Sequence, residues 1–441
     1  MQLVRNVSQP AALPPGRRGW PIIGETLEFI RDPAFVSKRM ALYGPIFQTH
    51  LLGRPTAIMV GADANRFILA DGKEHFEHRN GMPAAALKLV GQGLPAQDGD
   101  AHRRVRTIIE PAFHQRALVH YFDTMQRLTL AALHGWSQSP TVDLPVAARH
   151  LTFAIASELL IGRRAGPQME ELGRLFDLTF RGLVAPPIDL PGFAYHRARR
   201  AQPNIVRFIA RAVAERQQRP TQDALSLLLE SRDERGEGLS LQEIQDQALT
   251  LMIAGHETTA KLITAFGVIL PHHPDILAQL RAEQTRFEGP LSLAQLSEMP
   301  YLDQVLREIE RYSPPARNGF REVIKPFTFN GCRVPAGWRV IYRPAETHRD
   351  SAFFHDPHRF DPERFGPERA EHRKNGYALV AFGGGPRLCI GRAFAQLEMK
   401  IIAAAWLRSY RWRCVQPDAL EQLNRPRAIY ENIPIELRAA P

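Results

Sequence analysis

Residues 382–391, FGGGPRLCIG, constrain this chain more than any other part of its 441 residues. The glycines allow a tight turn in which backbone can approach a flat ligand closely. A helix is predicted over residues 392–407, directly after Cys389. Free N–H groups at the start of that helix would stabilise a thiolate at Cys389, and Arg387 could pair with a carboxylate of a bound group. A lone cysteine beside glycines is usually a buried structural residue, but this combination predicts a ligand site.

A second cluster, AGHETT at residues 254–259, falls inside a long predicted helix. That helix begins with a capping-box pattern, Ser240 and Glu243, and continues for about 30 residues, or roughly 45 Å. Glycine, an acid and two threonines are poor helix formers, and such a local conflict tends to mark function. The Thr258 hydroxyl can bond the carbonyl four residues earlier, which opens the helix for water or dioxygen. Glu257 and Thr258 could then relay protons; the plainer interpretation is a packed helix with incidental polar residues.

The composition limits the class of protein. Hydrophobic residues make up 44% and charged residues 23%, which is ordinary for a globular chain. The net charge of +10 is dispersed, so we expect solvated surface first, an acidic redox protein as partner next, and nucleic acid last. Cys332, Cys389 and Cys414 form no C-x-x-C pair, which argues against a zinc or dithiol site. No secretory signal and no run of 18 apolar residues is found, so we expect a cytoplasmic protein without a transmembrane anchor.

Helical patterns dominate residues 100–310, and strand-like patterns lie toward both ends of the chain. Runs at residues 46–52 and 56–60 predict a small hairpin, and strand and turn segments return after Pro314. The opening, residues 13–29, is rich in proline and glycine and is predicted to be irregular. Because no linker or repeat divides the chain, residues 1–441 are predicted to form a single, mainly α domain with a small β-rich region.

The segment 382–391 resembles the haem-binding signature of the cytochrome P450 family, F-x-x-G-x-R-x-C-x-G. All its fixed positions match, at Phe382, Gly385, Arg387, Cys389 and Gly391. The resemblance implies the P450 fold and a haem b cofactor. It implies that Cys389 is the proximal iron ligand, that Arg387 contacts a haem propionate, and that Phe382 and Gly391 belong to the haem-binding loop. A thiolate ligand pushes electron density onto the iron and favours O–O cleavage.

Other motifs extend the resemblance. Glu257 and Thr258 match the acid–alcohol pair of the family's oxygen-activation motif. Glu308 and Arg311 match its E-x-x-R pair, which in the family meets the arginine of a later P-E-R-F, here Arg364. We predict that these last three residues are structural, although E-x-x-R alone is usually an ordinary surface ion pair.

The resemblance also implies further haem contacts. His102 and Arg106, four residues apart on a predicted helix, are expected at the propionates together with Arg321. Many family members have tryptophan where His102 stands. The neighbouring Arg103 and Arg104 are interpreted as a solvated basic helix face.

The predicted reaction is reductive activation of dioxygen and insertion of one oxygen atom into a C–H bond of a small apolar substrate. No flavin or iron–sulfur segment is present, so electrons are expected from a separate ferredoxin or flavodoxin with its reductase. Two alternatives stay open. A haem-thiolate isomerase or peroxygenase would not need Glu257 and Thr258, and a non-catalytic haem sensor would need neither that pair nor a substrate pocket.

Residues 13–29, 43–55, 319–324 and 380–385 look similar to cyanobacterial-type soluble P450s related to retinoic-acid hydroxylases. We therefore predict a long apolar substrate with one anionic end, such as a retinoid or fatty acid, with a neutral terpenoid as the alternative. The residues expected to form its pocket are Leu87, Leu89, Phe180, Leu183, Val184, Ala254, Ile188, Leu190, Phe193 and Phe320. Arg79, Lys88 and Arg317 are the candidate partners of the anionic end, and residues 180–193 form the predicted lid.

Overall fold

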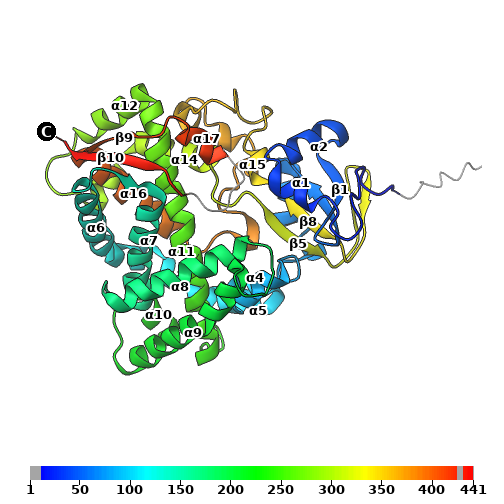
Figure 1. Cartoon of the computed structure of the whole chain (residues 1–441), viewed down its shortest axis with the longest axis horizontal. Helices are drawn as coiled ribbons and strands as arrows, with labels where there is room; N and C mark the ends of the chain where they lie inside the picture. Colours follow the sequence, from blue (N-terminus) through cyan, green and yellow to red (C-terminus); the bar gives the residue numbers. More distant parts are fainter. Residues whose placement is uncertain (1–10, 425–430, 441) are drawn as a thin grey trace, which may run out of the picture.

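The structure is a computed structural model that describes residues 11–424 and 431–440. Figure 1 shows a helical part, crossed by α11 (Leu241–Ile269), and a smaller lobe at one end. In that lobe α1 (Thr26–Arg31) and α2 (Phe35–Tyr43) lie beside β1 (Ile46–Leu51), β5 (Gly319–Val323) and β8 (Arg339–Tyr342). The chain is therefore mainly α, with a small β region drawn from both of its ends, as predicted.

The other elements have the following bounds. The helices are α3 (Ala62–Arg66), α4 (Ala84–Val90), α5 (Gly99–Ile109), α6 (Gln115–Ser137), α7 (Leu144–Ile161), α8 (Pro167–Val184), α9 (Ala194–Gln218), α10 (Ala224–Glu230), α12 (Pro274–Gln284), α13 (Leu293–Ser297), α14 (Pro300–Tyr312), α15 (Pro344–Thr347), α16 (Arg392–Ser409) and α17 (Ala419–Asn424). The strands are β2 (Arg54–Met59), β3 (Phe76–Glu77), β4 (Val142–Asp143), β6 (Phe327–Phe329), β7 (Cys332–Val334), β9 (Tyr410–Cys414) and β10 (Pro434–Ala439).

The largest sheet has the strand order β1-β2-β8-β5-β3. Its β1–β2 hairpin lies where the sequence predicted one, and β8 pairs in parallel with β2. Side chains of consecutive strand residues point to opposite faces of a sheet. Phe320 on β5 packs into an apolar cluster with Phe47 and Ile341, so its neighbour Arg321 faces the other way. This alternation decides which of the two residues can reach the site described below.

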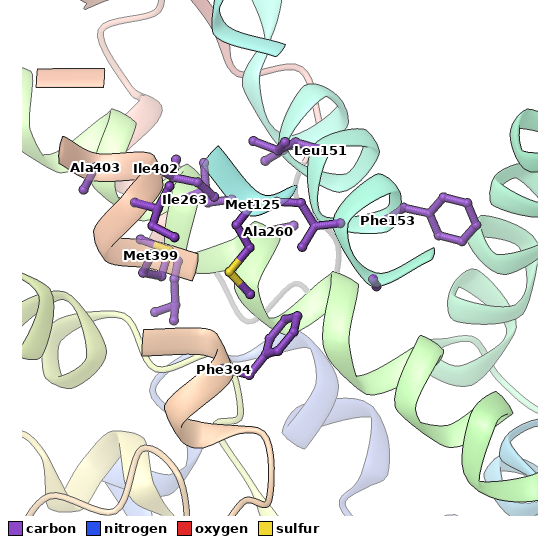
Figure 2. Packing of buried hydrophobic residues seen from close by; sticks show 14 of the residues in the cluster. Met125, Leu151, Phe153, Ala260, Ile263, Phe394, Met399, Ile402 and Ala403 are labelled. Carbon is purple, nitrogen blue, oxygen red and sulfur yellow. The ribbon is translucent and has the colours of Figure 1, made fainter. Parts of the chain in front are cut away.

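The central helix α11 begins with the predicted capping box. The Ser240 hydroxyl accepts a hydrogen bond from the Glu243 N–H (3.2 Å), and the Glu243 carboxylate accepts one from the Ser240 N–H (2.7 Å). Figure 2 shows Ala260 and Ile263 of α11 packed among buried side chains of its neighbours. Those labelled neighbours are Met125 on α6, Leu151 and Phe153 on α7, and Phe394, Met399, Ile402 and Ala403 on α16. Because α11 is enclosed on several sides, the position of residues 254–259 is fixed.

Among the described helices, α7 is long and apolar enough to cross a membrane by length and composition alone. However, 72% of that segment is buried inside the protein, where it packs against α11. A helix that is apolar on all sides is also what a large core requires.

Glu308, Arg311 and Arg364 form a charge network whose side chains are all 0% exposed. Arg311 donates two hydrogen bonds to the Glu308 carboxylate (2.7 and 2.8 Å), and Arg364 donates one to the same carboxylate (3.2 Å). Arg364 also pairs with the buried carboxylate of Glu371 at 2.9 Å. Buried charges are tolerated only when paired and hydrogen-bonded in this way.

The network is connected to the cysteine loop through His348. Arg311 donates to the His348 carbonyl (2.8 Å), and the Nε2 atom of His348 accepts a hydrogen bond from the Val380 N–H (3.0 Å). Nε2 can accept only when it carries no proton, and burial together with the Arg311 charge lowers the pKa of His348 to about 3. This neutral histidine therefore ties α14 to the segment that enters residues 382–391.

Two predictions about local structure were incomplete. The opening segment is irregular up to Glu25, but α1 begins at Thr26, inside the segment predicted to be irregular. The chain after α16 was predicted to be strand-like and also contains the short helix α17. Both helices are only six residues long, and short helices carry little periodic signal in sequence.

We predict that Arg311→Ala lowers the free energy of unfolding by about 3–5 kcal/mol, because it leaves the buried Glu308 carboxylate without its main partner. The purified variant should contain little haem and should melt well below the wild type in a calorimetric scan. The matched control is Arg413→Ala, which removes an exposed arginine paired with Glu436. Equal melting and haem content of the Arg311 variant and this control would show that the network is dispensable.

Candidate active site

Residues 382–391 form a tight loop in front of α16. The Cys389 N–H donates to the Phe382 carbonyl (2.9 Å), and Gly391 is the residue that precedes the first turn of the helix. Gly385 has φ of +57°, and a Cβ atom there would lie 2.0 Å from the Leu69 carbonyl oxygen, so only glycine fits. The loop thus presents Cys389 at the start of α16, as the sequence predicted.

The environment of the Cys389 thiol contains opposing influences. Burial raises its pKa, while a hydrogen bond from Gly391 and the positive charges of Arg106 and Arg392 lower it. Burial is the largest of these. A metal ion bound by a cysteine displaces the thiol proton outright. Cys389 would therefore be a thiolate once it coordinates a cation, even though burial raises the pKa of the free thiol.

Three guanidinium groups converge beside the loop. Arg106 on α5 donates to the Leu388 carbonyl (2.7 Å), next to Cys389, and Arg387 donates to the Gln97 carbonyl (2.6 Å) and to the Asp98 carboxylate. Burial lowers the pKa of Arg387 to about 10, and the charges of Arg321 and Arg106 add to this effect. The structure therefore gathers three cations from α5, β5 and the cysteine loop around one acidic group, Asp98.

His102 completes this cluster from α5. Burial lowers its pKa to about 4, and the charges of Arg387 and Arg106 lower it further. The sequence did not single out His78, which lies in the same field and whose pKa burial lowers to about 3. Both imidazoles are thus neutral at pH 7, when they can donate a hydrogen bond without adding positive charge.

A cavity of about 300 Å³ lies between α11 and the cysteine loop. Six of the residues singled out in the sequence line it: Ala254, Thr258, Phe382, Arg387, Cys389 and Gly391. The remaining lining is largely apolar, with Phe113, Leu160, Leu251, Leu262, Pro315, Ala316, Val380, Ile390 and Phe394 among its members. Apart from Ala316, which belongs to a turn expected beside the pocket, the sequence did not single out these side chains, because a buried Leu or Phe beside a cavity looks the same in sequence as one in the core.

Thr258 and Glu257 occupy two sides of α11. The Thr258 hydroxyl faces the cavity and donates to the Ala254 carbonyl at 2.6 Å, as predicted. Glu257 is 2% exposed, and its Oε2 atom makes no hydrogen bond within the described residues. Burial raises the pKa of Glu257 to about 7, against the nearby charges of Lys261 and Arg149. A carboxyl with this pKa can both give and take a proton near neutral pH.

The described residues that line the cavity do not include Leu87, Phe180, Arg317 or Phe320. Phe320 belongs to the cluster around Phe47 on the far face of β5, because strand side chains alternate. The ring centroid of Phe180 lies 5.4 Å from the Lys261 ammonium, and Arg317 donates to the Leu423 carbonyl (2.8 Å). These four residues therefore lie outside this cavity, and their contact with substrate stays a prediction.

The remaining pocket predictions fall in two groups. Leu89 is fully buried in a cluster with Tyr195 and Ala198, and Leu183 packs against it, so these two stabilise α4, α8 and α9. The others lie on the surface: Arg79, Lys88, Val184, Ile188, Leu190 and Phe193. Residues 185–193 connect α8 and α9, the place predicted for a lid.

A family model described as cytochrome P450 matches residues 14–436 of the chain. The chain belongs to the cytochrome P450 family. It is 37% identical over 419 residues to the putative cytochrome P450 120 of Synechocystis sp., with 94% of each chain covered. It is 34% identical to cytochrome P450 26B1 of Mus musculus, with 90% of this chain and 81% of the relative covered. The solved structure of retinoic-acid-bound cyanobacterial CYP120A1 matches with a TM-score of 0.91 and 36% identity, over 98% of this chain and 100% of that one.

As a P450, the protein is a haem-thiolate monooxygenase, and the residues present fit haem. Haem carries two propionate carboxylates, and the cluster of Arg106, Arg321 and Arg387 has positive charge in excess of Asp98. The two propionates, paired with these arginines, would offset the free-energy cost of burying the positive charges. The same cavity offers the Cys389 sulfur as the ligand for iron.

We predict that Thr258→Ala and Glu257→Gln bind haem normally but form less product per electron consumed. In the wild type, the yield of product per electron should fall as the pH rises through about 7, because Glu257 then loses its proton. In Glu257→Gln the yield should be low at every pH, since the amide cannot donate in its place. Hydrogen peroxide release and product formation, measured together across pH, test this.

The matched control is Thr264→Ala. Thr264 makes the same type of bond on the same helix, to the Ala260 carbonyl at 2.8 Å, but is buried and does not line the cavity. Unchanged yield and unchanged pH dependence in both the Thr258 and Glu257 variants would contradict the proton relay.

Proposed function

We propose that this P450 hydroxylates a long apolar carboxylic acid, resembling a retinoid or fatty acid. The similarity to the solved structure of retinoic-acid-bound CYP120A1 is the observation that carries the proposal. An extended hydrocarbon also needs an apolar wall, and the α11 side of the cavity, opposite the cysteine loop, supplies Leu251, Ala254 and Leu262.

Within this proposal the site residues have distinct roles. Cys389 holds the iron, while Arg106, Arg321, Arg387 and His102 orient the haem through its propionates. Haem with a thiolate ligand supplies reductive activation of dioxygen. The close contacts of Arg106 with the Leu388 carbonyl and of Arg387 with Asp98 keep the cations in place.

The proton supply rests on Thr258 and Glu257. Thr258 presents its hydroxyl to the cavity, and Glu257 stores a proton behind it, on the side of α11 that faces Lys261 and Arg149. The Thr152 hydroxyl on α7 donates to the His256 carbonyl (2.8 Å), which fixes this turn of α11 against α7. A peroxygenase does not have to deliver protons to bound dioxygen, and an isomerase or a haem sensor needs no proton relay, so Glu257 and Thr258 favour the monooxygenase.

Electrons come from a separate ferredoxin or flavodoxin, in our proposal, in the cytoplasm. Gln115 on α6 and Ala393 and Gln396 on α16 line one surface pocket, so the start of α6 lies beside the first turns that follow Cys389. Arg116 is exposed at this place, and Arg103 is exposed on α5. Such cations attract an acidic redox protein at rates that fall with ionic strength.

The substrate class predicts a preference between two ligands that differ in charge. Retinoic acid should bind at least tenfold more tightly than its methyl ester when its carboxylate pairs with the half-buried Arg317, because an ion pair shielded from water contributes a few kcal/mol. One of three variants, Arg317→Ala, Arg79→Ala or Lys88→Ala, should remove the preference. Substrate-induced difference spectra of the haem give both dissociation constants, and Arg438→Ala, an exposed arginine on β10, is the control.

Arg317 can serve only if it exchanges its bond to the Leu423 carbonyl for the ligand. Equal affinity of the unaltered protein for acid and ester would contradict the anionic end, and a neutral terpenoid would then be the better candidate.

A further inference from the structure

A second cavity, of about 480 Å³, lies between α7 and α8. Its walls come from one face of each helix, with Phe153 and Ser157 on α7 and Gly173 and Asp177 on α8 at spacings of four residues. Figure 2 shows the Phe153 ring pointing away from the other labelled side chains of the core. Within the part of the chain that the structure describes, this cavity shares no lining residue with the one beside Cys389. It is therefore a separate space, which the haem chemistry does not use.

The cavity exists because small residues face each other across it. Ala154 on α7, Ala165 and Gly166 before α8, and Gly173 on α8 contribute little or no side chain. A Cβ atom at Gly173 would lie 3.4 Å from the Phe153 ring, so a longer side chain there would extend into the space. Protein interiors otherwise contain few voids larger than a water molecule. Cavities of about 300–1,000 Å³ have the size that holds a small organic ligand.

His256 on α11 also lines the cavity and offers it a hydrogen-bond acceptor. Its Nδ1 atom donates to the Met252 carbonyl on its own helix (2.7 Å), and the Nε2 atom lies on the opposite edge of the ring. The residue is 2% exposed, and burial lowers its pKa, which leaves Nε2 without a proton. No described residue donates a hydrogen bond to Nε2. A ligand that brings a donor to this buried acceptor would therefore be stabilised there.

The neighbours of His256 fix its position. The rings of Phe153 and Phe176 lie edge-on to the imidazole, with centroids 5.7 and 5.9 Å from its own. The Thr152 hydroxyl holds the His256 carbonyl, as described above. A ligand that contacts His256 thus touches the turn of α11 that carries Glu257, without entering the haem cavity.

Ser157 supplies a second polar group at the same cavity. It is 1% exposed, and its hydroxyl oxygen makes no hydrogen bond within residues 11–424 and 431–440. A serine hydroxyl can donate as well as accept, whereas an imidazole nitrogen without a proton only accepts. A hydroxyl group on a ligand matches both, because it can donate to His256 and accept from Ser157 at once.

The charged groups of the lining cancel. Arg149 and Arg174 are matched by Glu170 and Asp177, and the Arg149 guanidinium lies 3.8 Å from the Asp177 carboxylate. Such a lining prefers neither an anion nor a cation. The Phe153 ring in its apolar part suits an aromatic ligand, since aromatic rings pack favourably edge to face.

We propose that this cavity is a second ligand site, which binds a neutral aromatic molecule that carries a hydroxyl group. The ring system packs against Phe153 between α7 and α8. The hydroxyl donates to Nε2 of His256 and accepts from Ser157. The site is distinct from the haem cavity and does not depend on the substrate class proposed above.

The test is isothermal titration calorimetry of 2-naphthol into the full-length holoenzyme, saturated with clotrimazole so that a bulky azole ligates the iron and blocks the haem cavity. The wild type should bind one 2-naphthol per protein. It should bind 2-methoxynaphthalene, which has no hydroxyl proton, roughly fivefold more weakly, the loss expected for one neutral hydrogen bond.

Three variants locate the site. Gly173→Leu fills the cavity and should lower the affinity for both ligands at least tenfold. His256→Phe should weaken 2-naphthol roughly fivefold and leave the ether unchanged, a pattern that misfolding cannot produce. Ser157→Ala should weaken both ligands alike, because the ether oxygen also accepts from the serine.

The matched control is Gly135→Leu, which adds the same side chain at a helical glycine on α6. No atom lies within 4 Å of the Cβ position there, and the residue is outside the cavity. It should bind both ligands as the wild type does.

Absence of saturable 2-naphthol binding in the presence of clotrimazole would overturn the proposal. Equal affinity of the wild type for 2-naphthol and its ether would also overturn it, as would unchanged binding by Gly173→Leu.

Discussion

The buried network of Glu308, Arg311 and Arg364 is the interaction on which the position of the active site depends. Its charges are fully shielded from water, so a partner that moved away would leave an uncompensated ion in the core. From Arg311 a hydrogen-bonded route passes through His348 to Val380, two residues before Phe382. The loop that presents Cys389 is therefore held by contacts from α14, far away in sequence. A loop made of glycines would otherwise have many conformations of similar energy.

A second feature is the free-energy cost of burying the charged groups of the active site. Burial raises the pKa of the Cys389 thiol and lowers that of Arg387, so the folded protein disfavours the charged form of both groups. Iron and two propionates supply the opposite charges, which makes the cofactor part of the fold's stability as well as its chemistry. Ligands that bind only the folded state stabilise it by mass action. Asp98 carries one negative charge against three arginines, so it does not neutralise the cluster by itself.

The sequence predicted those features whose interacting residues lie close together in the chain, and it missed those whose partners lie far apart. The capping box at Ser240, the bond from Thr258 to the Ala254 carbonyl and the cysteine before α16 are local patterns, and all were found. His348, Asp98 and His78 were missed, because their roles arise from partners far away in the chain.

Phe320 was assigned to the pocket for its apolar side chain, and it packs against the cluster of Phe47 and Ile341. Leu89 was assigned to substrate for its apolar side chain, and it packs against α9 instead. Hydrophobicity identifies a buried residue but not the element that buries it. The motifs therefore identified the family and its cofactor, whereas the packing of apolar residues such as Leu89 and Phe320 required the structure.

The position of the Soret band in the reduced, CO-bound protein tests the central claim most directly, namely that Cys389 binds the haem iron as a thiolate. The account predicts a band far to the red of a histidine-ligated haem, lost in Cys389→His and kept in Cys332→Ser and Cys414→Ser, which alter the other two cysteines. A Cys389→His protein that retains the red-shifted band, or a wild type that lacks it, would contradict the account.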